Sequence, residues 1–179
     1  MGILLGFAPF IVFALLSGIS ISLALWLAFA AAFAIGIRDF LHAKIIRLLD
    51  LTCLMLFAML ALYVGFIQPG LPVQAVRMIA DIVLLLLALI SMARRVPFTE
   101  QYVRDEAPEH LWGTPAFVRM TYMLSAVWAA AFLVMAVADG LATFQQYLSF
   151  SLDAAIGLVA LAAAVVFTLR YPPQFTASR

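Results

Sequence analysis

Four ionisable residues lie within or beside strongly apolar stretches, and their positions predict a buried polar network. Arg77 and Asp81 are four residues apart and therefore share one face of a helix. Asp139 and Asp153 stand near the end and the start of two later apolar stretches. An ionisable side chain inside a bilayer is costly unless it is paired or hydrated, so such residues are candidate functional positions. The chemistry they could support is a proton or cation relay, or a polar lining for a substrate.

The same four residues have a purely structural interpretation. An Arg77–Asp81 pair could fix helix packing, while Asp139 and Asp153 reach water at the membrane interface. The spacing favours this structural interpretation over a relay. The functional alternative is a small proton- or ion-coupled transporter that uses Asp81, and it stays open at this point.

A second candidate site is the hydrophilic stretch 94–116, which combines aromatic, basic and acidic side chains. Thr99 is placed to cap a short helix that ends before Pro108. Aromatic residues at interface depth anchor such a segment, so we expect an amphipathic cytoplasmic loop that serves as a docking surface. Its candidate interface residues are Tyr102, Arg104, Glu109, His110 and Trp112.

Catalysis in this loop is the weaker interpretation. Glu109 and His110 are adjacent in the sequence, and adjacent side chains diverge on a helix. None of the spacings HExxH, HxxxH or DxxD occurs, so no catalytic or metal-binding residues are assigned. A lipid-modifying enzyme acting through Glu109 and His110 remains a third alternative, but the sequence favours a non-enzymatic protein.

The composition determines the class of protein that must position these residues. Hydrophobic residues make up 67% of the 179 residues and charged residues 11%, against roughly half and a quarter in soluble domains. A net charge of +1 argues against nucleic-acid binding. Cys53 is the single cysteine, which excludes an internal disulfide and a thiolate-rich metal site. The two histidines fall at the edges of the apolar stretches, so we expect no haem or other cofactor.

The apolar stretches predict an all-α, polytopic membrane protein, a single transmembrane domain over residues 1–179. A helix needs about 20 mainly apolar residues to cross the hydrocarbon core. The first of six stretches has only about 15 residues and contains Pro9, so it is expected to be a short or re-entrant helix in a tight hairpin with the second. The six predicted helices are 3–17, 19–37, 46–67, 73–93, 117–138 and 148–169.

The basic residues predict the orientation. With six spans, the side that holds both termini carries nine basic residues, and the other side carries Arg77 alone. This positive-inside bias puts both termini in the cytoplasm, and we expect a bacterial inner membrane. A short charged segment, 38–50, is expected to contact lipid headgroups, with Asp39 beside His42 and Arg47 beside Asp50. The nine basic residues on the side of the termini are Arg38, Lys44, Arg47, Arg94, Arg95, Arg104, Arg119, Arg170 and Arg179.

Several segments resemble the intracellular septation protein A family of small polytopic bacterial membrane proteins. The opening FAPFIVF at 7–13, the exit from the fourth stretch through LIS at 89–91 and RVP at 95–97, and SAVWAAAF at 125–132 are similar to that family in kind and order. Asp139 stands where the family usually has asparagine, and the loop 98–116 is longer.

The resemblance implies a non-enzymatic role in envelope organisation or septation, through contacts with other membrane proteins. We therefore expect the chain to lie in a lipid bilayer and to bind either membrane-protein partners or further copies of itself. An accessory subunit of a larger membrane complex is a further alternative, because small all-helical chains often serve that way.

Overall fold

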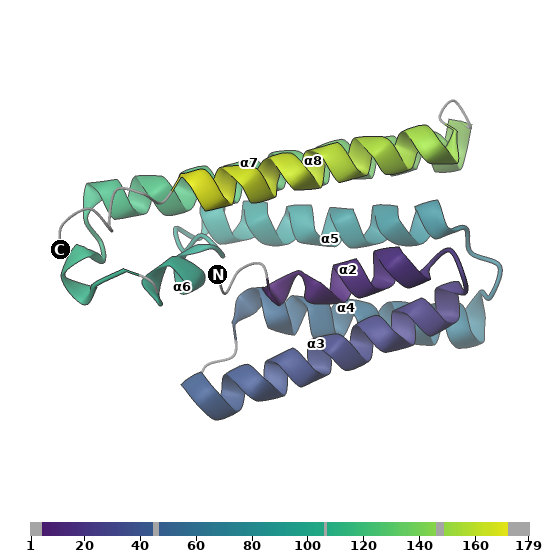
Figure 1. The fold of residues 1–179 in the computed structure, drawn as a ribbon, viewed down its shortest axis with the longest axis horizontal. Helices are drawn as coiled ribbons and strands as arrows, with labels where there is room; N and C mark the ends of the chain where they lie inside the picture. The colour runs from purple at the N-terminus through teal and green to yellow at the C-terminus, as the bar shows by residue number, and fades with distance from the viewer. Residues whose placement is uncertain (1–4, 45–46, 106, 146–148, 172–179) are drawn as a thin grey trace. The chain divides into compact units, whose positions relative to one another are not determined.

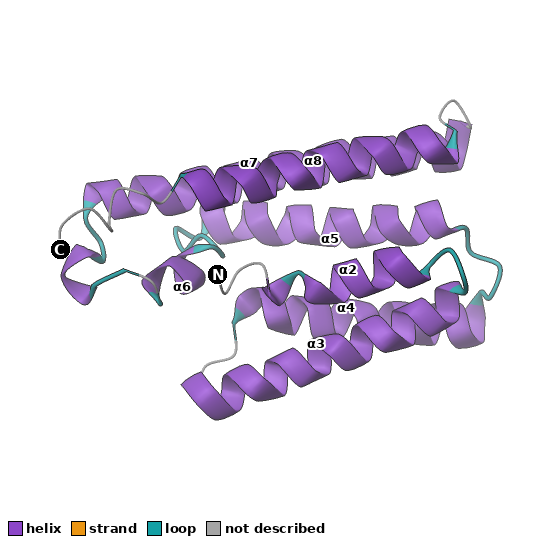
Figure 2. Ribbon diagram, viewed as in Figure 1, coloured by secondary structure: helices purple, strands orange, loops and turns teal. Residues whose placement is uncertain are grey.

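Every element in the described part of the chain is a helix, as the sequence predicts (Figure 2). The computed structural model describes residues 5–44, 47–105, 107–145 and 149–171. The chain divides into two compact units, Met1–Val76 and Arg77–Arg179, called unit 1 and unit 2 below. Helix α5, Val73–Ala93, begins at the end of unit 1 and lies mainly in unit 2.

Five helical segments are long and apolar enough to cross a membrane, which makes this a multi-pass helical membrane protein. The segments agree with five of the six predicted stretches to within a few residues, except that 117–138 extends at both ends. Its predicted length was too short because the helix already begins at Pro115, which Thr114 caps, and because the turns after Ala138 are less apolar but still helical. The five segments are Ile21–Leu41, Leu48–Ile67, Val73–Ala93, Pro115–Phe144 and Ser151–Arg170.

Unit 1 is built around a helical hairpin whose first arm is short. Helix α2, Ala8–Leu16, has nine residues and so extends only about 14 Å, and it packs along α3, Ile21–Ala43 (Figure 1). Ser20 caps α3 by accepting a hydrogen bond from the Leu23 amide at 3.4 Å. The tight hairpin is confirmed, whereas the sixth crossing stays a prediction, because α2 is shorter than the five segments that are long enough to span.

Aromatic packing closes unit 1. Helix α4, Leu48–Leu62, continues into a π-helical turn, η1, Tyr63–Ile67, and packs against α3. The ring of Phe57 on α4 lies 4.9 Å from that of Phe10 on α2, measured between centroids. The Cys53 thiol is buried and donates to the Gly6 carbonyl at 3.7 Å, so it behaves as a core side chain.

Unit 2 consists of α5 and a second, long hairpin. Helix α7, Pro115–Gly140, ends in a π-helical turn, η3, Leu141–Gln145, and α8, Phe150–Arg170, returns beside it (Figure 1). Trp128 of α7 is fully buried and donates from Nε1 to the Thr168 hydroxyl of α8 at 3.0 Å. Two short helices, α6, Glu100–Arg104, and η2, Glu109–Leu111, lie between α5 and α7.

Candidate functional site

The four residues predicted to form a polar network do meet in unit 2. Arg77 of α5 reaches both arms of the α7–α8 hairpin: its Nη2 lies 3.4 Å from Asp139 Oδ1 and its Nη1 lies 3.3 Å from Asp153 Oδ2. Asp81 lies one turn further along α5, and the Asp139 carboxyl is among its neighbouring charged groups. These four residues are called the acidic cluster below.

All three carboxyls of the acidic cluster are removed from solvent. Asp139 and Asp153 are 0% exposed and Asp81 is 3% exposed, while the Arg77 side chain keeps 20% of its surface. Asp81 Oδ2 and both carboxyl oxygens of Asp139 and of Asp153 make no hydrogen bond to any described residue. Buried polar atoms normally have such a partner, so this is an unusual concentration of unsatisfied oxygens.

The helices explain why these side chains converge. Asp81 lies about 12 Å from the start of α5, near the middle of that span. Asp139 stands in the last turn of α7, and Asp153 stands in the first turn of α8, directly after the Ser149 cap. Because α7 and α8 run in opposite directions, their connected ends face the first turns of α5 across Arg77.

Gly157 makes room for the guanidinium. A Cβ atom at this position of α8 would lie 3.1 Å from Arg77 Nη2, closer than almost all real Cβ contacts. Arg77 therefore rests directly on the α8 backbone, one turn after Asp153. A larger residue here would push the guanidinium away from one of its two carboxylates.

Thr143 follows Asp139 by four residues in the π-helical turn η3, and no sequence pattern singles it out. Its hydroxyl is buried and makes no hydrogen bond to any described residue. A π-helical turn widens the helix and is often found at functional sites, but the sequence carries no signal for it.

The charges of the acidic cluster do not balance. Three carboxylates and one guanidinium amount to a net charge of −2 when all are ionised. Burial of uncompensated charge is costly, so the cluster is expected to take up protons or small cations. Among the residues that the structure describes, no three His, Cys, Asp or Glu side chains form a group suited to hold a metal ion.

A second set of buried polar contacts links α7 to the C-terminal end of α5 and to the segment that follows α5. The Thr99 hydroxyl lies 2.8 Å from the Thr121 carbonyl oxygen, to which it donates, and 2.9 Å from the Ser125 hydroxyl. The Phe98 amide donates to Ser91 Oγ at 3.1 Å. The Tyr122 hydroxyl donates to the Met92 carbonyl at 3.1 Å. These contacts are called the hydroxyl network below.

The hydroxyl network corrects one detail of the sequence analysis. Thr99 does precede helix α6, as predicted, but its side chain makes no capping hydrogen bond. The hydroxyl instead bonds to α7, because residues 97–99 are buried and not exposed at the surface. Residues 97–99 of the segment predicted to be an amphipathic loop therefore lie inside unit 2.

The five candidate interface residues fall into a buried and an exposed group. Tyr102 is only 4% exposed, whereas Trp112 is 38% exposed. The Arg104 guanidinium lies 5.2 Å from the centre of the Trp112 ring and bonds Glu100 at 2.5 Å, and Trp112 Nε1 donates to the Ala107 carbonyl at 3.1 Å. Glu109 and His110 are exposed in η2.

In the charged segment of unit 1, Asp39 forms ion pairs with two arginines, while its predicted neighbour His42 has a side chain that lies outside the described ones. Arg38 donates from Nε and Nη2 to Asp39 Oδ1 at 2.9 and 2.7 Å, and Arg47 bonds Asp39 Oδ2. Asp39 therefore joins the end of α3 to the residue before α4. Asp50 is buried in the first turn of α4.

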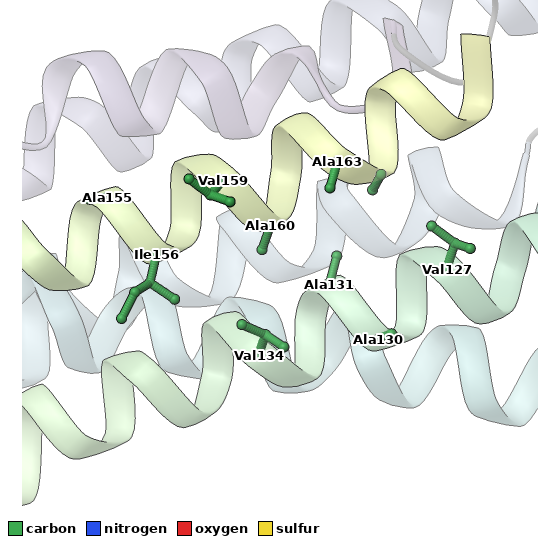
Figure 3. A pocket seen from close by; sticks show the side chains of 10 residues that line it. Val127, Ala130, Ala131, Val134, Ala155, Ile156, Val159, Ala160 and Ala163 are labelled. Carbon is green, nitrogen blue, oxygen red and sulfur yellow. The ribbon is translucent and has the colours of Figure 1, made fainter. Parts of the chain in front are cut away.

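An apolar groove of about 560 Å³ lies between α7 and α8 (Figure 3). Only alanine, valine and isoleucine side chains line it, so it offers no group for catalysis or for binding a charged molecule. Its lining residues are Val127, Ala130, Ala131, Val134, Ala155, Ile156, Val159, Ala160, Ala163 and Ala164.

No family model, curated protein or solved structure matches this chain. The class of protein is therefore defined by the helices alone: a multi-pass helical membrane protein with a buried acidic cluster in unit 2. The resemblance to the septation protein A family stays a prediction.

Proposed function

We propose that this protein is a small proton- or cation-coupled transporter in which the acidic cluster binds the coupling ion. The observation that carries the proposal is the burial of three carboxyls around a single guanidinium. An arrangement that served packing alone would need one carboxylate for one arginine. The two additional acids raise the cost of the site and are explained by the uptake and release of positive charge.

The position of the acidic cluster along unit 2 supports one orientation of the chain in the membrane. Arg94, Arg95, Arg119 and Arg170 lie at the ends of α5, α7 and α8 that are remote from the acidic cluster. Basic residues flank the cytoplasmic ends of membrane helices, so we propose that the cluster belongs to the non-cytoplasmic half of a bacterial inner-membrane protein. The C-terminus is then cytoplasmic, and the N-terminus is too if the α2 region completes a sixth crossing.

Proton flux into liposomes tests the proposal. The purified protein is reconstituted with a pH-sensitive dye inside the vesicles, and a potassium diffusion potential, negative inside, is applied with valinomycin. We expect uptake of protons by the wild type and a loss of at least tenfold in Asp81→Asn, because the amide cannot exchange a proton at physiological pH. Flux in Asp105→Asn, an exposed acid outside the cluster, should equal that of the wild type.

Two results would contradict the proposal. One is a wild-type protein that moves neither protons nor Na⁺ or K⁺ under any gradient. The other is flux that Asp81→Asn leaves unchanged.

A second candidate function is the organisation of envelope or septation proteins through direct contacts. The observation that favours it is the exposed Trp112 ring, held by the Ala107 carbonyl and by the Arg104 guanidinium. Tryptophan and arginine are enriched among residues that dominate binding energy at interfaces. Recovery of cross-linked membrane partners by the wild type and by Trp112→Ala tests this candidate.

A further inference from the structure

The contacts of Arg77 differ from those of the other arginine–carboxylate pairs in the chain. Arg38 and Arg104 donate hydrogen bonds to carboxylate oxygens at 2.9 Å or less. Arg77 stays 3.3 and 3.4 Å from its two carboxylates, and none of the four oxygens accepts a hydrogen bond from a described residue. Its guanidinium is thus a counter-charge between two acids and does not make the bidentate hydrogen bonds that arginine usually forms.

The location of the guanidinium is one that a free cation would occupy. It lies between a carboxylate of α7 and a carboxylate of α8, against the bare backbone at Gly157. Asp139 lies in the last α-helical turn of α7, directly before the π-helical turn η3. Asp81 is 3% exposed, and its Oδ2 accepts no hydrogen bond from a described residue.

We propose that Arg77 is a tethered cation that fills the metal-cation position of this site and thereby restricts its exchangeable ion to the proton. The inference rests on the proposed function, since it names the coupling ion and the residue that selects it. The guanidinium offsets one of the two negative charges of Asp139 and Asp153, and the excess negative charge that remains favours a proton on Asp81, the acid on the same helix as Arg77. The charged groups facing Asp81 are Arg77 on its own helix, Asp139 on α7 and Asp153 on α8.

A carboxyl pair such as Asp81 and Asp139 can share a single proton in a hydrogen bond between the two groups. A metal ion needs several oxygen ligands around it, and the guanidinium already occupies the space between Asp139 and Asp153. Removal of the guanidinium should open that space. The unsatisfied oxygens of the carboxylates would then be free to turn toward a metal cation.

The test is the dependence of thermal stability on cations in detergent. The wild type and Arg77→Ala are unfolded by heating in NaCl, KCl, CaCl2 or choline chloride at equal ionic strength and pH. We expect the wild-type midpoint to be the same in all four salts. The midpoint of Arg77→Ala should rise by about 5–10 °C in at least one metal salt relative to choline, as for a site filled at a hundred times its dissociation constant.

Two further variants make the result specific. Arg77→Lys keeps a tethered cation and should show no response to metal salts. If Arg77→Ala does not fold, the double variant Arg77→Ala with Asp153→Asn lowers the excess negative charge, and the same dependence is expected. The matched control is Arg119→Ala, a change of an exposed arginine near the start of α7, which should respond like the wild type.

A folded Arg77 variant whose midpoint is equal in the metal salts and in choline would overturn the inference. So would a wild-type midpoint that itself rises specifically in Na⁺, K⁺ or Ca²⁺. The failure of the proposed function is distinguishable, because it appears as absent flux in the wild type, whereas this experiment measures stability without any gradient.

Discussion

Helix α5 contacts the α7–α8 hairpin near both ends of α5, and the two sets of contacts use different chemistry. Near its C-terminal end, the hydroxyl network consists of neutral groups that pair with each other at 2.8–3.1 Å, such as Thr99 with the Thr121 carbonyl. Near its N-terminal end, the acidic cluster consists of charged groups at 3.3–3.4 Å, with several buried oxygens that accept no hydrogen bond from a described residue.

The difference separates a packing contact from a site. Hydrogen bonds between satisfied neutral groups stabilise helix association modestly and give no reason for a proton or ion to enter. Buried acids in excess of their counter-charges are costly, and such residues are retained in membrane proteins mainly where they function. Helix association alone needs only contacts of the first kind, so the acidic cluster is the better candidate for function.

The largest effect is expected from removing the counter-charge of the acidic cluster. Arg77→Gln leaves Asp139 and Asp153 buried without a cation, which should lower the free energy of unfolding by about 3–5 kcal/mol at neutral pH. Unfolding of the detergent-solubilised protein by dodecyl sulfate measures this change. Arg119→Gln, with its exposed side chain, is the matched control and should change stability by less than about 0.5 kcal/mol.

A loss below about 1 kcal/mol for Arg77→Gln would contradict the description of the acidic cluster as a charged, buried group. The contacts at the two ends of α5 would then contribute similarly to the free energy of unfolding.

A smaller effect is expected in the hydroxyl network. Thr99→Val removes the donor to the Thr121 carbonyl and the contact with Ser125, at a cost of about 1–2 kcal/mol in the same assay. The matched control is Thr52→Val, because the Thr52 hydroxyl bonds only the Leu48 carbonyl of its own helix. We expect the control to change stability by less than about 0.5 kcal/mol.

Proton flux should also distinguish the acidic cluster from the hydroxyl network. If Thr99→Val lowered flux as strongly as Asp81→Asn does, the hydroxyl network would not be a mere packing contact.

The sequence predicted the helices and the members of the acidic cluster because both depend on local signals. Apolar length determines the spans, and the rarity of charge inside them singles out Arg77 and Asp81. The pairing partners could not be predicted in the same way. Which carboxylates Arg77 meets depends on how α7 and α8 pack, and the roles of Gly157 and Thr143 appear only when the guanidinium and the π-helical turn are placed.

The burial of Thr99 and Tyr102 could not be predicted because the local composition of their segment is misleading. Residues 94–116 have the composition of a surface loop, and that composition describes the second half of the segment correctly. Residues 97–99 instead pack against α7 through Thr99, a tertiary contact that overrides local polarity.

The smallest effect on stability is expected at Trp112, on the surface segment beyond the hydroxyl network. Trp112→Ala removes an exposed ring and its contacts with Arg104 and the Ala107 carbonyl, which should change the free energy of unfolding by less than about 1 kcal/mol. If this segment organises partner proteins, the same substitution should lower the recovery of cross-linked membrane partners at least tenfold. Trp112→Phe, which keeps an aromatic ring, should retain most of that recovery. Unchanged recovery in Trp112→Ala would remove the second candidate function, and an unfolding change well above 1 kcal/mol would show that Trp112 serves the fold of unit 2 and not a partner.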